Sequence, residues 1–95
     1  MRLEFSPEAR RDLFELSALI AADGGAQRAL AYIDRLERRC AVLLTFPQAG
    51  TSRGDLRRGL RVLGFERRVV IAYVVRADRV VVQRVLYGGR VPVAG

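Results

Sequence analysis

The sequence predicts an α+β domain in which an antiparallel helical hairpin covers one face of an antiparallel sheet, in the order β-α-α-β-β-β. A short alternating segment begins the chain, two segments with helical apolar spacing follow it, and three apolar segments separated by short turns come last. Helices over one face of a sheet bury the apolar side of both layers. We expect one domain over residues 1–90 and a flexible C-terminal tail over residues 91–95.

The N-terminal half predicts one strand and the helical hairpin. Residues 2–5 alternate in polarity, and Ser6 and Pro7 then suit an N-cap and a first helical position. A glycine pair ends the first helix, and the second is expected from about Ala26 to about Thr45, before a Phe-Pro pair. The apolar stripe of the second helix is Ala29, Leu30, Ile33, Leu36, Cys40 and either Leu43 or Leu44.

The C-terminal half predicts three strands with no helix between them. They are expected at about residues 56–63, 67–75 and 79–87. The connections at residues 64–66 and 76–78 are short enough for hairpins, so the strands form an antiparallel meander. The middle strand is apolar on both faces, which predicts a central position with the helices on one face and partial cover on the other. The first strand should pair beside one strand of this meander.

Composition limits the chemistry available to the chain. There is no histidine, every basic residue is arginine, and Cys40 is the one cysteine. This excludes a disulfide framework and the usual kind of zinc site, and we expect no metal and no cofactor. Cys40 lies on a helical apolar stripe and is expected to be a buried small hydrophobic residue. The N-terminus lacks the apolar run of a signal peptide, and no segment reaches the roughly 18 apolar residues of a membrane span. We therefore expect a cytoplasmic protein with no membrane partner.

The positive charge is confined to the C-terminal half. Residues 1–52 carry seven arginines and seven acidic residues, whereas residues 53–95 carry ten arginines and three acidic residues, which accounts for the whole net charge of +7. This asymmetry predicts a basic face for nucleic acid or for an acidic protein. Alternation in the predicted strand puts Arg57 and Arg61 on one side and Arg58 on the other. An acidic partner segment, phosphate or an acidic protein patch would satisfy this cluster.

Arg84 leaves two interpretations open. It alternates with apolar residues and is predicted to share a face of the last strand with Val80 and Val82. A charge on that face needs either a cleft that reaches solvent or an internal ion pair. In the first case Arg84 is a functional cation, and in the second it pairs with Glu66, Asp55 or an acidic residue of a helix.

Four fragments, in order along nearly the whole chain, resemble the RelE/ParE toxin superfamily. They are residues 5–9 (FSPEA), Phe46-Pro47 followed by a glycine, residues 53–61 (RGDLRRGLR) and residues 78–90 (DRVVVQRVLYGGR). The last is similar to the final strand of the family, in which an Arg-Val-Leu triplet precedes histidine, glycine and arginine. This sequence departs from that pattern because Tyr87 stands where many relatives have histidine.

The resemblance implies the toxin of a type II toxin–antitoxin system. A cognate acidic, ParD-like antitoxin would neutralise it in a hetero-oligomer, and operator DNA would be reached only through that antitoxin. ParE-like members inhibit DNA gyrase, and RelE-like members are ribosome-dependent mRNA endonucleases. We favour a ParE-like gyrase inhibitor without a hydrolytic site, because the chain has no histidine or lysine to carry protons and arginine keeps its own. A third possibility is an inert module that binds its partner, regulates transcription and causes no growth arrest.

The candidate site residues follow from this resemblance and from the charge pattern. The residues expected to bind the target or the antitoxin are Arg57, Arg58, Arg61, Arg84, Tyr87 and Arg90. In a nuclease, Arg61 and Arg84 would hold the phosphate, and Tyr87 would donate a proton or stack on a base. The alternative role for Tyr87 is aromatic packing at the end of the sheet.

Overall fold

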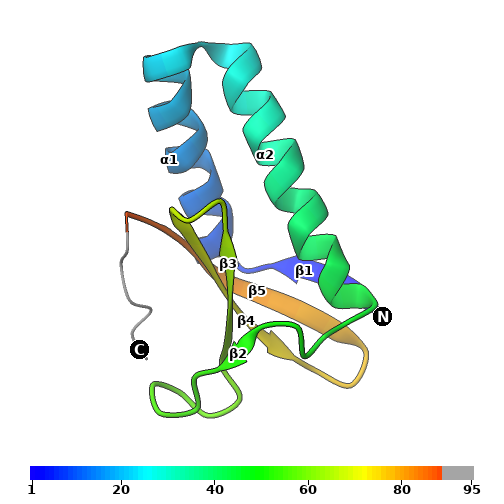
Figure 1. Ribbon diagram of the computed structural model, residues 1–95. Helices are drawn as coiled ribbons and strands as arrows, with labels where there is room; N and C mark the ends of the chain where they lie inside the picture. Colours follow the sequence, from blue (N-terminus) through cyan, green and yellow to red (C-terminus); the bar gives the residue numbers. More distant parts are fainter. Residues whose placement is uncertain (89–95) are drawn as a thin grey trace.

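The computed structural model describes residues 1–88 and confirms the α+β architecture (Figure 1). The predicted tail and the end of the predicted domain lie outside these residues. The elements are β1 (Arg2–Phe5), α1 (Pro7–Gly24), α2 (Ala26–Ala41), the 3₁₀ helix η1 (Val42–Leu44), β2 (Thr51–Ser52), β3 (Arg61–Phe65), β4 (Val69–Val75) and β5 (Arg79–Tyr87). The strand order β1-β5-β4-β3-β2 makes β4 central, as predicted, and β1 lies beside a strand of the meander, as expected. The pairing of β1 with β5 is parallel, so the sheet is mixed and not antiparallel throughout as predicted. The β3-β4-β5 meander is antiparallel.

The entry into α1 is fixed by Ser6. Its hydroxyl accepts a hydrogen bond from the Ala9 amide at 3.0 Å and donates one to the Gln83 carbonyl at 2.8 Å. Its own amide donates to the Val82 carbonyl at 2.9 Å. The predicted N-cap and the predicted proline at the helix start are both confirmed. Ser6 therefore ties the start of α1 to β5 at the point where β1 ends.

The second helix is shorter than predicted. α2 ends at Ala41, four residues before Thr45, and the chain tightens into η1. A proline disfavours helical backbone in the residue before it, so the chain leaves the helix ahead of Pro47. Leu43 is buried and Leu44 is partly exposed, which settles the alternative at the end of the stripe. The placement of Leu30 on the buried stripe was wrong, because 69% of its surface is exposed.

The prediction of a strand at about residues 56–63, the first of the meander, is wrong over most of its length. β3 begins at Arg61, and residues 53–60 form a loop of turns closed by a hydrogen bond from the Arg53 amide to the Leu60 carbonyl at 2.8 Å. Leu56 and Leu60, which suggested a strand, instead pack against Ala72 and Val74 on the sheet face opposite the helices. The expected cover on this second face is therefore supplied by the loop.

Two further features of the sheet were not predicted. The two-residue strand β2 pairs with β3 and adds a fifth strand. The hairpin turn lies at residues 66–68 rather than 64–66, because Gly64 pairs with Val70 in the ladder. β5 matches its predicted bounds, and β4 begins two residues later than expected, at Val69.

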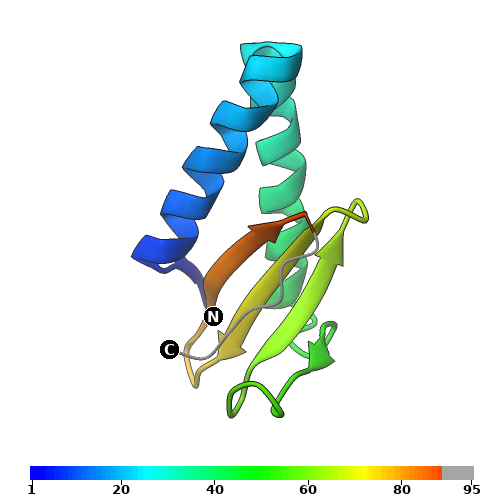
Figure 2. The same ribbon diagram turned by 90° about the vertical axis from the view of Figure 1, so that its left-hand side faces the viewer.

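The main core lies between the helices, which stand over the sheet in Figure 2, and the facing side of the sheet. Its fully buried members include Leu36, Cys40, Leu43, Ile71, Tyr73, Val80 and Val82. The predicted burial of Cys40 is confirmed, and desolvation raises the pKa of its thiol to about 12. At neutral pH the thiol is therefore protonated and inert.

A bulge in β5 changes which side chains face the helices. The register between β4 and β5 shifts after Ala72, so that Ala72 pairs with Arg84 and Tyr73 with Val82. Val80 and Val82 belong to the main core before the bulge, and Val85 does so after it. Alternation therefore puts Arg84 on the other face, and the prediction that it shares a face with Val80 and Val82 is wrong.

Candidate functional site

Arg57 and Arg58 lie in the loop of residues 53–60, where strand alternation does not apply. The Arg57 guanidinium donates to Gln83 Oε1 at 2.7 Å, which holds the loop against β5. Arg58 is exposed and has no hydrogen bond or ion pair with the residues that the structure describes. The base of the loop is closed by an ion pair from Arg53 Nε to Asp55 Oδ1 at 3.0 Å, and this guanidinium lowers the pKa of the Asp55 carboxyl. These contacts fix the loop of residues 53–60 while Arg57 and Arg58 remain exposed on it.

Arg61 has a structural task at the start of β3. Its Nη2 donates to the carbonyls of Gln48 at 3.2 Å and Gly50 at 2.7 Å. The buried Tyr73 hydroxyl holds the same segment, since it donates to the Pro47 carbonyl at 2.8 Å and accepts from the Gly50 amide at 2.9 Å. Arg61 and Tyr73 together fix the connection between η1 and β2.

Arg84 makes an internal ion pair with an acidic helix residue, which is the second of its two predicted interpretations. Its Nε and Nη2 donate to the two carboxylate oxygens of Asp12 on α1, at 2.8 and 3.1 Å. The Val85 amide donates to Asp12 Oδ2 at 2.9 Å. This carboxylate raises the pKa of the Arg84 guanidinium through the hydrogen bonds. The pairing of β1 with β5 ends at Val82, and the mostly buried carboxylate of Asp12 (11% exposed) accepts the hydrogen bond of a β5 backbone amide beyond that point.

Tyr87 is half-buried at the end of β5 and packs against the main core. Its hydroxyl accepts a hydrogen bond from Arg68 Nη1 at 3.3 Å, which raises the pKa of Arg68. The guanidinium groups of Arg61 and Arg84 engage different partners, on the η1–β2 connection and on α1. Arg90 lies outside the described residues. The structure therefore assigns Arg61, Arg84 and Tyr87 to three separate sets of contacts.

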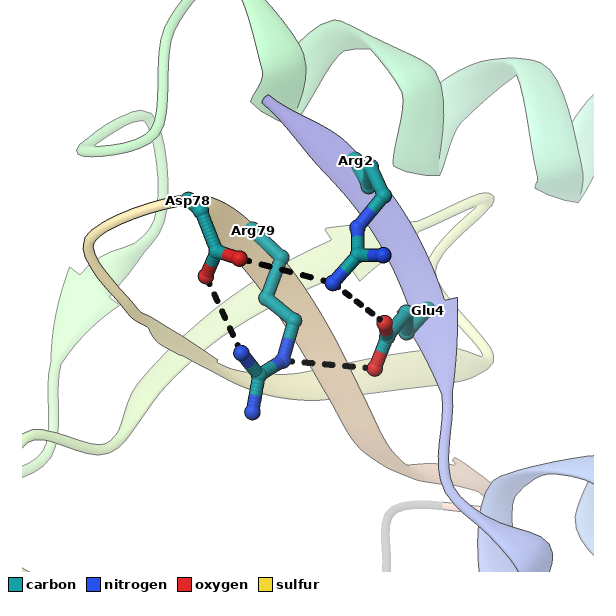
Figure 3. A network of polar contacts seen from close by, with 4 residues as sticks. All are labelled: Arg2, Glu4, Asp78 and Arg79. Atoms are coloured by element: carbon teal, nitrogen blue, oxygen red, sulfur yellow. Dashed lines mark hydrogen bonds and ion pairs between the residues drawn. The ribbon is translucent and has the colours of Figure 1, made fainter.

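A second internal network joins β1 to β5 (Figure 3). Arg2 and Arg79 alternate with Glu4 and Asp78 through four contacts of 3.0–3.4 Å. All four side chains are at least a third exposed, so this network adds little stability for each pair. Its main effect on the site is that the charge of Arg79 is balanced locally.

The remaining cations of the C-terminal half leave a positive excess. Within residues 53–88, carboxylate partners are found for Arg53, Arg79 and Arg84. The arginines of this segment without such a partner among the described residues are Arg57, Arg58, Arg61, Arg67, Arg68 and Arg76. Internal ion pairs therefore neutralise only part of the basic half that the sequence predicted.

An apolar groove along the helical hairpin was missed by sequence reasoning. It encloses about 340 Å³, and its lining residues are Phe5, Arg10, Leu13, Phe14, Ser17, Leu30, Ile33 and Glu37. Phe14 and Leu30 are 76% and 69% exposed, although exposed aromatic and leucine side chains on a helix lose apolar burial. The available signal was that Phe14 lies outside the helically spaced apolar positions of α1, which are Ala9, Leu13, Leu16 and Ile20. With two exposed apolar side chains at its rim, the groove is a candidate interaction surface.

Comparison with known proteins decides the family. A sequence model described as "ParE toxin of type II toxin-antitoxin system, parDE" matches residues 3–92. The chain belongs to the ParE toxin family. The resemblance to the RelE/ParE superfamily and its ParE-like branch is thus confirmed, and the chain is a ParE-like type II toxin.

One solved structure shares this fold. The chain is similar to a structure described as the chromosomal ParDE toxin–antitoxin system from P. aeruginosa, with a TM-score of 0.80 and 20% identity over 93% of this chain and 96% of that one. A conserved hypothetical protein from Helicobacter pylori matches at a TM-score of 0.46 and 14% identity, over 92% and 93% of the two chains. A search of curated proteins found no match.

Two structural findings bear on partners and metals. None of the helices within residues 1–88 is long and apolar enough to cross a membrane. The same residues hold no group of three or more His, Cys, Asp or Glu side chains placed to share a metal ion.

Proposed function

We propose that this ParE-like toxin arrests growth in the cytoplasm by binding DNA gyrase, and that it carries out no hydrolysis itself. The observation that supports this function is the excess, within residues 53–88, of arginines without carboxylate partners among the described residues, in a chain that has no histidine or lysine. Such side chains bind an acidic protein surface well but exchange protons poorly. The separate engagements of Arg61, Arg84 and Tyr87 favour binding over the RelE-like alternative.

Within this proposal the predicted residues have different roles. Arg58 contacts the target directly, because it is exposed on a braced loop and has no hydrogen bond or ion pair among the described residues. Arg57 is also exposed, but it donates to Gln83, so it braces the loop and adds to the positive charge there. Arg61 and Arg84 support the fold, because their guanidinium groups are held by the Gly50 carbonyl and by the Asp12 carboxylate. Tyr87 positions Arg68 at the end of the sheet. Arg90 stays a predicted contact.

The experiment compares growth arrest with two enzymatic assays. Expression of the wild-type chain without an antitoxin should stop colony formation, and the purified chain should inhibit supercoiling by gyrase while cellular messages stay intact in primer extension. Replacing Arg57 and Arg58 together by Ala should weaken gyrase inhibition at least tenfold. The matched control replaces Arg38, which is exposed and paired with Asp34 on α2, and should leave inhibition unchanged. Cleaved messages with normal gyrase activity would establish the RelE-like alternative, and normal growth would establish the inert regulatory module.

We further propose that a ParD-like acidic antitoxin neutralises the toxin by covering the helical groove, in a hetero-oligomer that reaches operator DNA through the antitoxin. The groove has the exposed apolar side chains that an amphipathic partner segment buries on binding. Arg10, which lines the groove, would attract an acidic residue of the same partner.

The antitoxin proposal is tested by rescue of growth. Phe14→Ser should keep the toxin folded and toxic but should prevent rescue by the co-expressed cognate antitoxin. Phe46→Ser is the matched control, since Phe46 is also exposed but borders a different hollow, at residues 45–49. Equal rescue of both variants would place the antitoxin elsewhere.

A further inference from the structure

The hairpin turn between β3 and β4 holds two residues in an unfavourable backbone conformation. Glu66 and Arg67 have φ angles of 48° and 63°. The turn closes through a hydrogen bond from the Arg68 amide to the Phe65 carbonyl at 3.3 Å. Turns with positive φ at both central residues normally contain Asn-Gly, because other side chains are strained there. A Glu-Arg pair at these positions therefore needs a compensating interaction or a functional reason.

Glu66 has a compensating interaction. Arg35 on α2 donates from Nε and Nη2 to the two carboxylate oxygens of Glu66, at 2.9 and 3.2 Å. These hydrogen bonds lower the pKa of the Glu66 carboxyl. The Arg35 guanidinium also lies 5.2 Å from the centre of the Tyr32 ring. Helix α2 thus stabilises the turn through the paired hydrogen bonds between Arg35 and Glu66.

Arg67 has no comparable interaction. Its side chain is exposed and makes no hydrogen bond or ion pair with any residue from 1 to 88. Glycine or asparagine at this position would relieve the strain without breaking any side-chain hydrogen bond or ion pair of the described chain. The fold itself therefore gives no reason for an arginine here, and strain of this kind is concentrated where a side chain is positioned for binding.

Arg68 adds a second positive charge at the same hairpin turn. Its carbonyl accepts a hydrogen bond from the Gly88 amide at 3.0 Å, and its Nη1 donates to the Tyr87 hydroxyl. Neither Arg67 nor Arg68 has a carboxylate partner among the described residues. The loop of residues 53–60 precedes β3 and the turn with Arg67 and Arg68 follows β3. The two basic segments therefore lie at opposite ends of this strand (Figure 1). Five strand residues separate them by roughly 17 Å.

The surrounding rings favour a carboxylate ligand over a nucleic acid base. Tyr32 has the Arg35 guanidinium over one face and meets Phe65 edge-to-face at 5.4 Å. Tyr87 packs against the main core. Bases of single strands are bound by stacking on free aromatic faces, whereas planar guanidinium groups bind carboxylates through paired hydrogen bonds.

We propose that Arg67 and Arg68 form a second target contact, which binds carboxylates on an acidic protein surface while the loop of residues 53–60 makes the first. This inference rests on the proposed function, because it takes the target to be a protein. It adds that the backbone strain at Arg67 is retained for target binding. Substitutions that relieve the strain should therefore stabilise the fold and weaken the toxin.

The experiment separates charge from strain at residue 67. Arg67→Gly and Arg67→Asn should keep or raise the thermal midpoint by a few degrees, yet increase surviving colonies at least tenfold upon expression. Arg67→Lys keeps both the charge and the strain but loses the paired hydrogen bonds, and should retain the wild-type midpoint and an arrest between those of the wild type and Arg67→Gly. Arg68→Gln provides a second loss of charge and should also reduce arrest. The matched control is Arg28→Gln on α2, an exposed arginine far from the turn, which should change neither quantity.

Each outcome distinguishes this inference from the proposed function. If the wild-type chain arrests growth and inhibits gyrase, but the Arg67 and Arg68 variants do so equally well, the second contact is refuted and the proposed function stands. A marked fall in the midpoint of Arg67→Gly would refute the role of strain. If the wild-type chain causes no arrest, the proposed function and the contact fall together.

Discussion

The contact between Asp12 and β5 offers the sharpest test of how this fold is held together. Asp12→Asn keeps the size of the side chain but removes its charge and replaces one acceptor oxygen by a donor. The native carboxylate accepts three hydrogen bonds of 2.8–3.1 Å, two from Arg84 and one from the Val85 amide. A hydrogen bond to a charged group contributes about 1.5–3 kcal/mol, and Asp12 is mostly buried whereas Arg84 is 40% exposed. Allowing for screening at Arg84, we expect a loss of about 2–3 kcal/mol in the free energy of unfolding.

A loss of this size is readily measured in a chain of 95 residues. Each kcal/mol lowers the melting temperature of such a domain by about 4–8 °C, so Asp12→Asn should melt roughly 10–20 °C below the wild type in far-ultraviolet circular dichroism. The control is Asp34→Asn, which breaks the Arg38 ion pair of 2.9 Å at an exposed position of α2 and should cost no more than about 0.5 kcal/mol. Equal urea midpoints for the two variants would show that the Asp12 contact does not secure the edge of β5.

Three further predictions concern buried groups. Tyr73→Phe should lose about 1–3 kcal/mol and speed hydrogen exchange at the Gly50 amide, because that amide and the Pro47 carbonyl lose their partner; unchanged exchange would contradict this role. Gly50→Ala should cost about 1–3 kcal/mol in urea unfolding, since its Cβ would lie 2.6 Å from the Val62 carbonyl oxygen; wild-type stability would show that β2 shifts freely. Cys40 should resist thiol reagents at pH 8 until the chain unfolds. Because its pKa rises from 9.0 to about 12 in the folded state, the unfolded chain ionises first, and stability should fall between these pH values more in the wild type than in Cys40→Ala.

Local patterns were sufficient to predict most of the elements. Ser6 and Pro7 mark the start of α1, and the apolar run of β4 indicates its central position, because each depends on neighbours in the chain. The prediction failed where a distant partner decides the structure. Leu56 and Leu60 have the composition of a strand, but they bury more surface by folding over Ala72 and Val74. A sequence pattern does not reveal which face of a sheet still needs cover.

The candidate site was harder to predict for the same reason. Counting charges located the basic half of the chain correctly, but it did not show which guanidinium groups are already occupied. The bulge after Ala72 turns Arg84 away from its expected face, and its pairing with Asp12 spans 72 positions of sequence. Likewise, the strain at Arg67 depends on the exact backbone of a turn that the sequence placed two residues too early.

The arginines of the basic half include an occupied set, Arg61 and Arg84, whose guanidinium groups are held by internal partners. They also include a free set, Arg58 and Arg67, which have no side-chain hydrogen bond or ion pair among the described residues. Changes at Arg84 and Arg61 remove internal contacts, so they should lower the free energy of unfolding, and any loss of toxicity should scale with the fraction of unfolded chain. Changes at Arg58 and Arg67 remove no side-chain hydrogen bond or ion pair within the described chain, so toxicity should fall while stability holds or rises. A toxin that binds through the free set must therefore show two classes of inactive variant, which unfolding measurements separate. If every inactive arginine variant were also unstable, the free arginines would have no part in binding.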